Sequence, residues 1–187
     1  MRSSTSADFT RPEYRNSIRS KTSIRKAFAE LLMQKDFDDI SVSDIIKGAD
    51  ISRATFYAHF ESPRDVLKAL VESAIDEVSL LLEPLKSPLG KEEVLRNLDR
   101  ITDYIKKHLD YVKALSKAER RCGLFLEIIS MKDGWPRGSQ KVLLFIIAGS
   151  YGIYTDAMSI DEEGALDDAR ESSLKMIRAL LEATVAE

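Results

Sequence analysis

The stretch Ile40–Leu67, ISVSDIIKGADISRATFYAHFESPRDVL, decides how the N-terminal part of this chain folds. Three serines in it stand where a helix can begin: Ser41, Ser52 and Ser62. A serine side chain accepts hydrogen bonds from the free N–H groups of a helix start, and Asp44, three residues after Ser41, completes a capping-box pattern. The stretch predicts three helices, from Ser41 to about Ala49, from Arg53 to His59, and from Pro63 to about Glu83.

An amphipathic helix is predicted before this stretch, over Ser17–Lys35. Its apolar residues recur at helical spacing: Ile24, Ala27, Phe28, Leu31 and Leu32. Two short helices joined by a tight turn at Asp50-Ile51, with a third helix in front, form a helix-turn-helix, in which the second short helix enters the major groove of DNA. We therefore expect a three-helix DNA-binding domain over residues 17–62, preceded by a flexible arm over residues 1–16.

The charge is distributed unevenly along the chain. The net charge is −3, but residues 1–26 carry seven Lys or Arg against two acidic residues. Residues 61–187 carry 18 basic against 23 acidic residues. A basic end on an acidic body favours local contact with DNA phosphates.

Composition also bears on the compartment. Cys122 is the single cysteine, which is typical of a reducing cytosol. The longest uncharged run, residues 142–155, is shorter than the roughly 20 residues of a membrane-spanning helix. We expect a cytoplasmic protein without a membrane partner.

Residues 63–187 are predicted to form a larger helical domain. After a loop at residues 83–90, apolar periodicity and breakers predict helices over 91–108, over 110–131 as one kinked or two shorter helices, over 139–159 and over 166–185. The fold class is therefore all-α.

Residues 19–70 resemble the DNA-binding region of the TetR and AcrR regulator family. The family pattern S-x-x-T-F-Y-x-H/Y-F is matched by residues 52–60. The resemblance implies a transcriptional regulator, by preference a repressor, that binds double-stranded operator DNA as a homodimer. It also implies that residues 63–187 bind a small-molecule inducer and mediate dimerisation.

Candidate DNA-binding residues follow from the motif. Arg53 can reach a guanine edge, and Ala54 or Thr55 a thymine methyl. Other polar side chains suit phosphate oxygens, as does the start of the helix at Pro63: Ser43, Thr55, Tyr57 and His59. The resemblance adds Arg19, Lys21 and Thr22, and Arg64 stands one residue after the position where the family often has Lys. Core positions are predicted at Ala49, Ile51, Phe56 and Phe60.

Two features of the larger domain suggest further sites. Gly149 and Gly152 in one helix predict close approach of another backbone, either across a dimer interface or within the monomer. Aromatic residues available to line an apolar ligand pocket are Tyr104, Phe125, Trp135 and Tyr151, although the same spacing also suits core packing.

Other functions fit less well. An enzyme is not expected, because the two histidines and one cysteine lie far apart and no phosphate loop, nucleophile elbow or metal-ligand spacing occurs. No cofactor or metal is expected. The remaining alternative is a helix-turn-helix adaptor that binds protein and lacks ligand-controlled induction.

Overall fold

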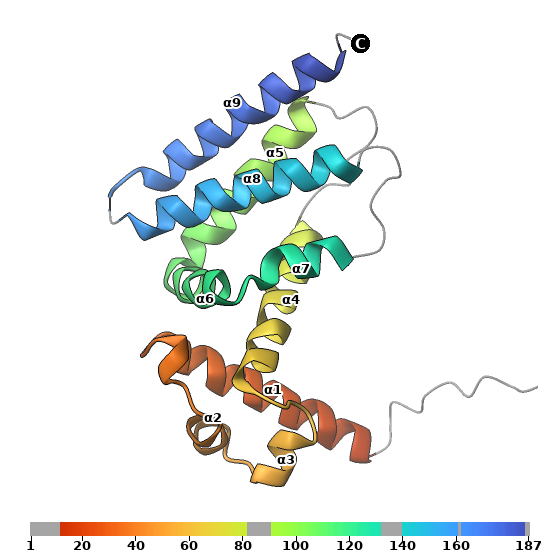
Figure 1. Ribbon diagram of the computed structural model, residues 1–187, viewed down its shortest axis with the longest axis vertical. Helices are drawn as coiled ribbons and strands as arrows, with labels where there is room; N and C mark the ends of the chain where they lie inside the picture. Colours follow the sequence, from red (N-terminus) through yellow and green to blue (C-terminus); the bar gives the residue numbers. More distant parts are fainter. Residues whose placement is uncertain (1–11, 82–90, 132–139, 161, 186–187) are drawn as a thin grey trace, which may run out of the picture. The chain divides into compact units, whose positions relative to one another are not determined.

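The computed structural model describes residues 12–81, 91–131, 140–160 and 162–185, and its regular elements there are all helical (Figure 1). In order they are α1 (Pro12–Leu32), the 3-10 turn η1 (Phe37–Asp39), α2 (Val42–Ala49), α3 (Arg53–Tyr57), α4 (Pro63–Leu81), α5 (Lys91–Lys107), α6 (Leu109–Cys122), α7 (Leu124–Met131), α8 (Gln140–Ser159) and α9 (Ala165–Val185). The predicted all-α fold class is confirmed. The chain divides into two compact units, Met1–Leu70 and Val71–Glu187, and the boundary between them falls within α4.

Helix α1 begins earlier than the sequence predicted. It starts at Pro12 rather than at Ser17, so residues 12–16 are helical and the predicted flexible arm over residues 1–16 is wrong for them. The prediction followed the apolar stripe, which starts at Ile24, whereas proline is well suited to the first position of a helix because its missing N–H has no intrahelical partner there. Residues 1–11 lie outside the described part of the chain.

The N-terminal unit has a core built from every one of its helices. The side chains that are fully excluded from solvent are Ile24 and Phe28 of α1, Ile45 of α2, Phe56 of α3, and Val66 and Leu67 of α4. Phe60 is also buried, as predicted, whereas Ala49 and Ile51 are only half-buried. Helix α2 packs on α1 and α3 on α2.

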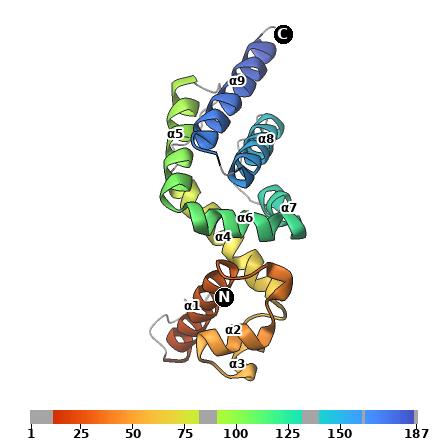
Figure 2. The ribbon, with the colours of Figure 1, turned by 90° about the vertical axis from the view of Figure 1, so that its left-hand side faces the viewer.

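The second unit is organised around α8 and α9, which run antiparallel and pack side by side, with α5 against α9 (Figures 1 and 2). Its core cluster draws on all three helices: Val94, Leu98 and Ile105 of α5, Tyr154, Ala157 and Met158 of α8, and Ala169, Leu174 and Ile177 of α9. No described helix combines the length and hydropathy needed to cross a bilayer.

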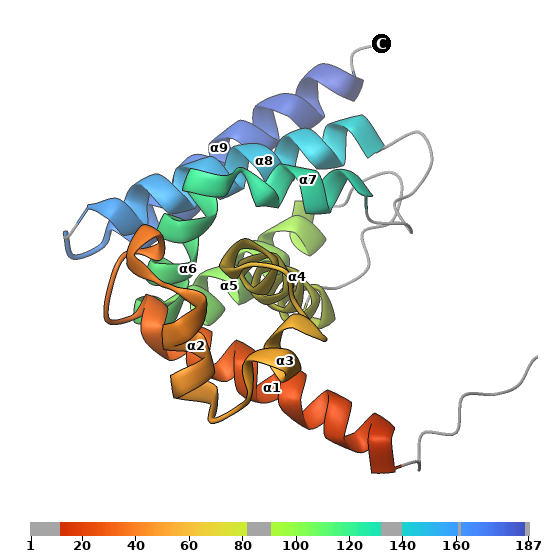
Figure 3. The same ribbon diagram turned by 60° about the horizontal axis from the view of Figure 1, so that its bottom comes forward.

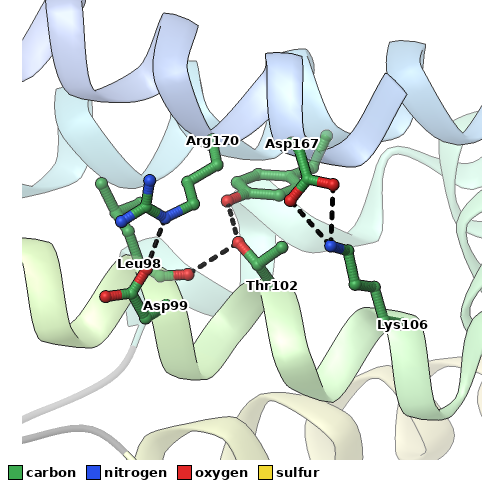
Figure 4. A network of polar contacts seen from close by, with 7 residues as sticks. Leu98, Asp99, Thr102, Lys106, Asp167 and Arg170 are labelled. Carbon is green, nitrogen blue, oxygen red and sulfur yellow. Dashed lines mark hydrogen bonds and ion pairs between the residues drawn. The ribbon is translucent and has the colours of Figure 1, made fainter. Parts of the chain in front are cut away.

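Polar contacts fix α5 to the other two helices (Figure 4). The Thr102 hydroxyl donates to the Leu98 carbonyl oxygen at 2.8 Å and lies 2.6 Å from the Tyr154 hydroxyl, and both side chains are buried. Lys106 forms an ion pair with Asp167, with Nζ–O distances of 2.7 and 2.9 Å, and Arg170 pairs with Asp99. The contacts join α5 to α8 at one point and to α9 at two.

The region 110–131 forms two helices, which resolves the two possibilities left open by its sequence. Helix α6 ends at Cys122 and is capped by Gly123, whose φ of 63° lies in the left-handed region that glycine adopts without steric cost. The chain then turns and α7 begins at Leu124.

Candidate nucleic-acid interface

The start of α2 is fixed by a complete capping box. Ser41 Oγ accepts a hydrogen bond from the Asp44 N–H at 3.2 Å, and the Asp44 carboxylate accepts from the Ser41 N–H at 2.9 Å and from Ser41 Oγ at 2.7 Å. Lys35 follows α1 in the sequence, and its Nζ donates to the same carboxylate oxygen at 2.8 Å. The hydrogen bond from Lys35, followed by those from Ser41, holds the pKa of Asp44 well below its usual range.

The turn between α2 and α3 sets the direction in which α3 starts. Asp50 adopts the left-handed conformation with φ 51°, and its N–H bonds back to carbonyl oxygens of α2. Ser52 then caps α3, its Oγ accepting from the Thr55 N–H at 3.0 Å and lying 2.8 Å from the Thr55 hydroxyl. Both caps were predicted from sequence, and they define the first turn of α3.

Helix α3 presents one side to solvent and buries the other. Phe56 is completely buried, whereas Arg53, Ala54 and Tyr57 are exposed. Tyr57 lies edge-on against Phe56, with 5.4 Å between ring centroids, and remains 50% exposed. Figure 3 brings α2 and α3 toward the viewer. The buried phenylalanine anchors the helix and leaves its first turn available for an external partner.

The other predicted contact residues of this unit are also accessible. Ser43, Arg19, Lys21, Thr22 and Arg64 are exposed, while Thr55 and His59 are half-buried. These residues lie on α1, α2, α3 and α4 and in the turn after α3. None of them is part of the buried core of the N-terminal unit.

Two contacts link predicted residues to neighbours within the domain. Arg53 Nη2 donates to Ser43 Oγ at 3.3 Å, which joins α3 to α2. Lys21 Nζ lies 5.7 Å from the centre of the Phe60 ring. The sequence contained no signal for either contact, since both depend on how the helices pack.

The start of α4 differs from the simplest expectation of a phosphate site. The Asp65 carboxylate accepts hydrogen bonds from the Glu61 N–H at 3.1 Å and from Ser62 Oγ at 3.0 Å. A carboxylate therefore already occupies part of the positive helix end, and less of it is left for a DNA phosphate.

The sequence did not predict that Lys35 contacts the capping residue Asp44. It stands nine residues before Asp44, across η1 and a turn, which is not a spacing that brings side chains together within one helix. No local signal could have identified the pair.

The predicted pocket aromatics fall into two groups. Phe125 of α7 stacks on Tyr151 of α8, with 3.8 Å between ring centroids and 10° between ring planes. Tyr104 instead donates to Glu77 at 2.9 Å and packs beside His108, and burial followed by the Glu77 contact raises its pKa. Trp135 lies outside the described residues, so the structure joins only Phe125 and Tyr151.

A buried carboxylate adjoins the stacked pair. Glu119 of α6 is only 4% exposed, and it accepts hydrogen bonds from the Phe125 N–H at 2.6 Å and from the Tyr151 hydroxyl. Burial raises its pKa, although bonds from backbone N–H groups of α7 act in the opposite direction. Glu119 therefore ties α6, α7 and α8 together.

The two glycines of α8 occupy different environments. A Cβ atom at Gly149 would lie 2.8 Å from Met176 Cε of α9, so its close approach is within the monomer. A Cβ at Gly152 would have no neighbour within 4 Å, and this residue is exposed. Of the two alternatives predicted from the sequence, packing within the monomer accounts for Gly149, although the neighbour is a methionine side chain and not a backbone. A dimer contact stays a prediction for Gly152.

Comparison with known proteins supports the reading of the N-terminal unit. Residues 24–70 match the model for bacterial regulatory proteins of the tetR family. The chain is 42% identical over 55 residues to the HTH-type transcriptional regulator EthR of Mycobacterium tuberculosis, covering 29% of this chain and 26% of that protein. It is 36% identical over 64 residues to the HTH-type dhaKLM operon transcriptional activator DhaS of Lactococcus lactis, covering 34% of each.

A longer match, with 28% identity over 102 residues, is to the uncharacterized HTH-type transcriptional regulator YdgC of Bacillus subtilis, covering 54% of this chain and 52% of that protein. The chain thus spans about half the length, or less, of these relatives. A crystal structure of a TetR transcriptional regulator from Streptococcus agalactiae superposes with a TM-score of 0.58 at 22% identity, covering 88% of this chain and 97% of that one. This likeness shows a shared fold.

Proposed function

Because residues 24–70 match the model for bacterial regulatory proteins of the tetR family, we propose that this chain is a sequence-specific transcriptional regulator of that family, which binds double-stranded operator DNA through α3. The observation that carries the proposal is the exposure of the first turn of α3. Its Arg53 and Ala54 are exposed while Phe56, in the same helix, is completely buried. A short helix anchored in this way presents an arginine that can bond the O6 and N7 atoms of guanine.

The remaining polar residues suit the DNA backbone. Phosphate contacts are proposed for the following residues, all exposed or half-buried: Lys21, Thr22, Ser43, Tyr57, His59 and Arg64. Thr55 can contact either a thymine methyl or a phosphate, although its hydroxyl already lies beside Ser52. Such contacts fix the register of the protein on DNA and carry no sequence information themselves.

We further propose a homodimer that binds an approximately palindromic operator, since a two-fold dimer presents the same reading helix to each half-site. Gly152 supports an interface on α8, because it is exposed and a side chain there would meet nothing within the protomer. The protein would act in the cytoplasm.

Ligand-controlled release from DNA is the regulatory part of the proposal. The stacked Phe125 and Tyr151, joined to buried Glu119, supply apolar surface beside polar groups, which suits a small apolar or aromatic ligand. A ligand that weakens operator binding tenfold must bind the DNA-free form about 1.4 kcal/mol more tightly than the DNA-bound form. We propose repression as the direction of control.

Selection from a random DNA pool tests the DNA-binding function. The full chain should enrich one sequence class, and Arg53→Ala should weaken binding to it by roughly 1 to 3 kcal/mol and relax preference at one position in each half-site. An unchanged affinity at equal salt would refute the recognition role of Arg53. Failure of the parent to enrich any sequence would favour the adaptor alternative.

A reporter assay separates repression from activation. A reporter gene behind the selected operator should be expressed less when the protein is present, and expression that rises instead would identify an activator. Candidate lipophilic compounds can be titrated while following fluorescence of the single tryptophan, Trp135, with and without operator. If every compound that binds leaves operator affinity unchanged, the ligand-controlled part of the proposal fails.

A further inference from the structure

The guanidinium of Arg53 is held by a residue outside its own helix. Its Nη2 atom donates a hydrogen bond to Ser43 Oγ at 3.3 Å, across the turn that separates α3 from α2. An arginine at the first position of a short exposed helix has many accessible rotamers. A hydrogen bond from its tip to a neighbouring helix favours those that place the tip near α2.

Ser43 is itself well fixed. It is the second residue of α2, directly before Asp44, whose carboxylate is bonded to the Ser41 N–H and hydroxyl and to Lys35. The backbone that carries Ser43 is therefore tied both to its own helix start and to the residue that follows α1. A side chain mounted there is a firm reference point for a flexible partner.

The chemistry of the two groups permits the bond to persist on DNA. A guanidinium has five N–H donors in one plane, and bonding to O6 and N7 of guanine uses two of them. The serine hydroxyl accepts from Arg53 and keeps its own hydrogen for another acceptor, such as a phosphate oxygen. One hydroxyl can thus hold the arginine plane while both residues remain on the DNA-facing side.

We propose that Ser43 is a positioning residue for Arg53, which orients the guanidinium plane and so sharpens discrimination among bases at the position that Arg53 reads. This inference rests on the proposed function. It assigns Ser43 a role in specificity, beyond the phosphate contact expected from the sequence. Planar, two-point recognition depends on orientation, so a loosely held arginine still attracts DNA but distinguishes bases less well.

The test measures the affinity of the full chain for four DNA duplexes. One is the selected operator, and the other three each carry a different base at the position where Arg53→Ala relaxes the base preference. The proteins compared are the parent, Ser43→Ala, Ser43→Thr, Arg53→Ala and the double variant Ser43→Ala/Arg53→Ala, at one salt concentration. Ser43→Thr keeps a hydroxyl and is the matched control. Thermal unfolding of each variant establishes that the domain remains folded.

Ser43→Ala should lower the ratio of matched to mismatched affinity by about twofold to tenfold, which corresponds to the loss of one hydrogen bond. Ser43→Thr should keep the ratio near that of the parent. In the Arg53→Ala background the serine substitution should cause no further loss of discrimination, because its effect passes through the arginine.

Two results would overturn the positioning role. One is an equal loss of affinity for all four operators in Ser43→Ala, which indicates a phosphate contact alone. The other is a result in which Ser43→Ala lowers the ratio of matched to mismatched affinity as much in the Arg53→Ala background as it does in the parent. If Arg53→Ala changed no base preference at any position, the recognition role of α3 would already have failed, and that result is distinct from failure of the positioning role alone.

Discussion

Met176 of α9 packs against the backbone of Gly149 in α8, so closely that a Cβ atom at position 149 would come within 2.8 Å of the Met176 Cε atom. Three residues along the same helix, a Cβ atom at Gly152 would meet nothing within 4 Å. Gly149 is therefore needed for packing within the protomer, whereas Gly152 lies at a surface that a second molecule could contact.

Substituting leucine at each glycine should give different results. Gly149→Leu should lower the free energy of unfolding by about 1 to 3 kcal/mol, because a bulky side chain exceeds what movement of the methionine tip can accommodate. Gly152→Leu should leave the protomer at least as stable and weaken the proposed dimer and DNA binding together. Urea unfolding and sedimentation measure the two effects. A Gly152→Leu protein that stays fully dimeric would remove this surface from the dimer interface.

The hydroxyl pair of Thr102 and Tyr154 predicts an asymmetric cost of substitution. Thr102→Val should destabilise the protein by about 1 to 3 kcal/mol, because the buried Tyr154 hydroxyl loses its partner. Tyr154→Phe should cost less, about 0.5 to 1.5 kcal/mol, because Thr102 still donates to the Leu98 carbonyl oxygen. Because Thr102 donates its one hydroxyl hydrogen to Leu98, the Tyr154 hydroxyl is the donor to Thr102. Denaturant unfolding of both variants and of the double variant checks this, and a larger cost for Tyr154→Phe would contradict that direction.

Glu119 should give the second unit a characteristic pH dependence. Its pKa is raised above the ordinary value of 4.5, mainly by burial, so the folded chain holds this proton more readily than the unfolded chain. Its contribution to stability is therefore present in full below pH 4.5 and decreases as pH rises through the folded pKa.

Glu119→Gln removes this titration. The stability of the parent should fall relative to that of Glu119→Gln as pH rises from 4.5 toward neutrality, as measured by urea unfolding at several pH values. Glu163→Gln, at an exposed position before α9, serves as the control and should show no such trend. A constant difference between parent and Glu119→Gln would contradict the raised pKa.

Asp44 should behave in the opposite sense. Its pKa is lowered from 3.8 by hydrogen bonds from Lys35 and Ser41, so its contribution to stability is present above pH 3.8 and is lost as pH falls toward the folded pKa. Asp44→Asn should reduce hydrogen-exchange protection of the α2 amides at neutral pH, and the difference from the parent should shrink in acid. Asp39→Asn, an exposed residue of η1, is the matched control. Equal protection in parent and Asp44→Asn at neutral pH would show that the capping contacts contribute nothing.

Lys21 allows a test of the proposed backbone contacts. Lys21→Ala should weaken binding to all DNA sequences alike and reduce the salt slope of binding by about 1, since a phosphate contact releases a counterion. Lys26→Ala, on the same helix and paired with Glu30 at 4.0 Å, is the control and should leave the slope nearly unchanged. A sequence-dependent effect of Lys21→Ala would instead assign this lysine to base recognition.

Features that depend on neighbours within one helix turn could be predicted from the amino-acid sequence. The caps at Ser41 and Ser52, the helix start at Pro63 and the apolar stripe of α1 were all predictable, because capping and amphipathicity act over three or four residues. These local signals were enough to predict the helical fold class and the helix-turn-helix. The break at Gly123 was not predicted, since the sequence of residues 110–131 is compatible with one kinked or two shorter helices.

Contacts between residues that are distant in the sequence could not be predicted and are known from the packing of the helices. Arg53 bonds Ser43 ten residues away, and Tyr151 bonds Glu119 at a separation of 32 residues. Such contacts depend on the angles at which whole helices pack, which are set by the combined shape of their buried side chains. Gly149 and Gly152 are indistinguishable in sequence for the same reason: only the position of α9 shows that the first faces Met176 and the second faces outward.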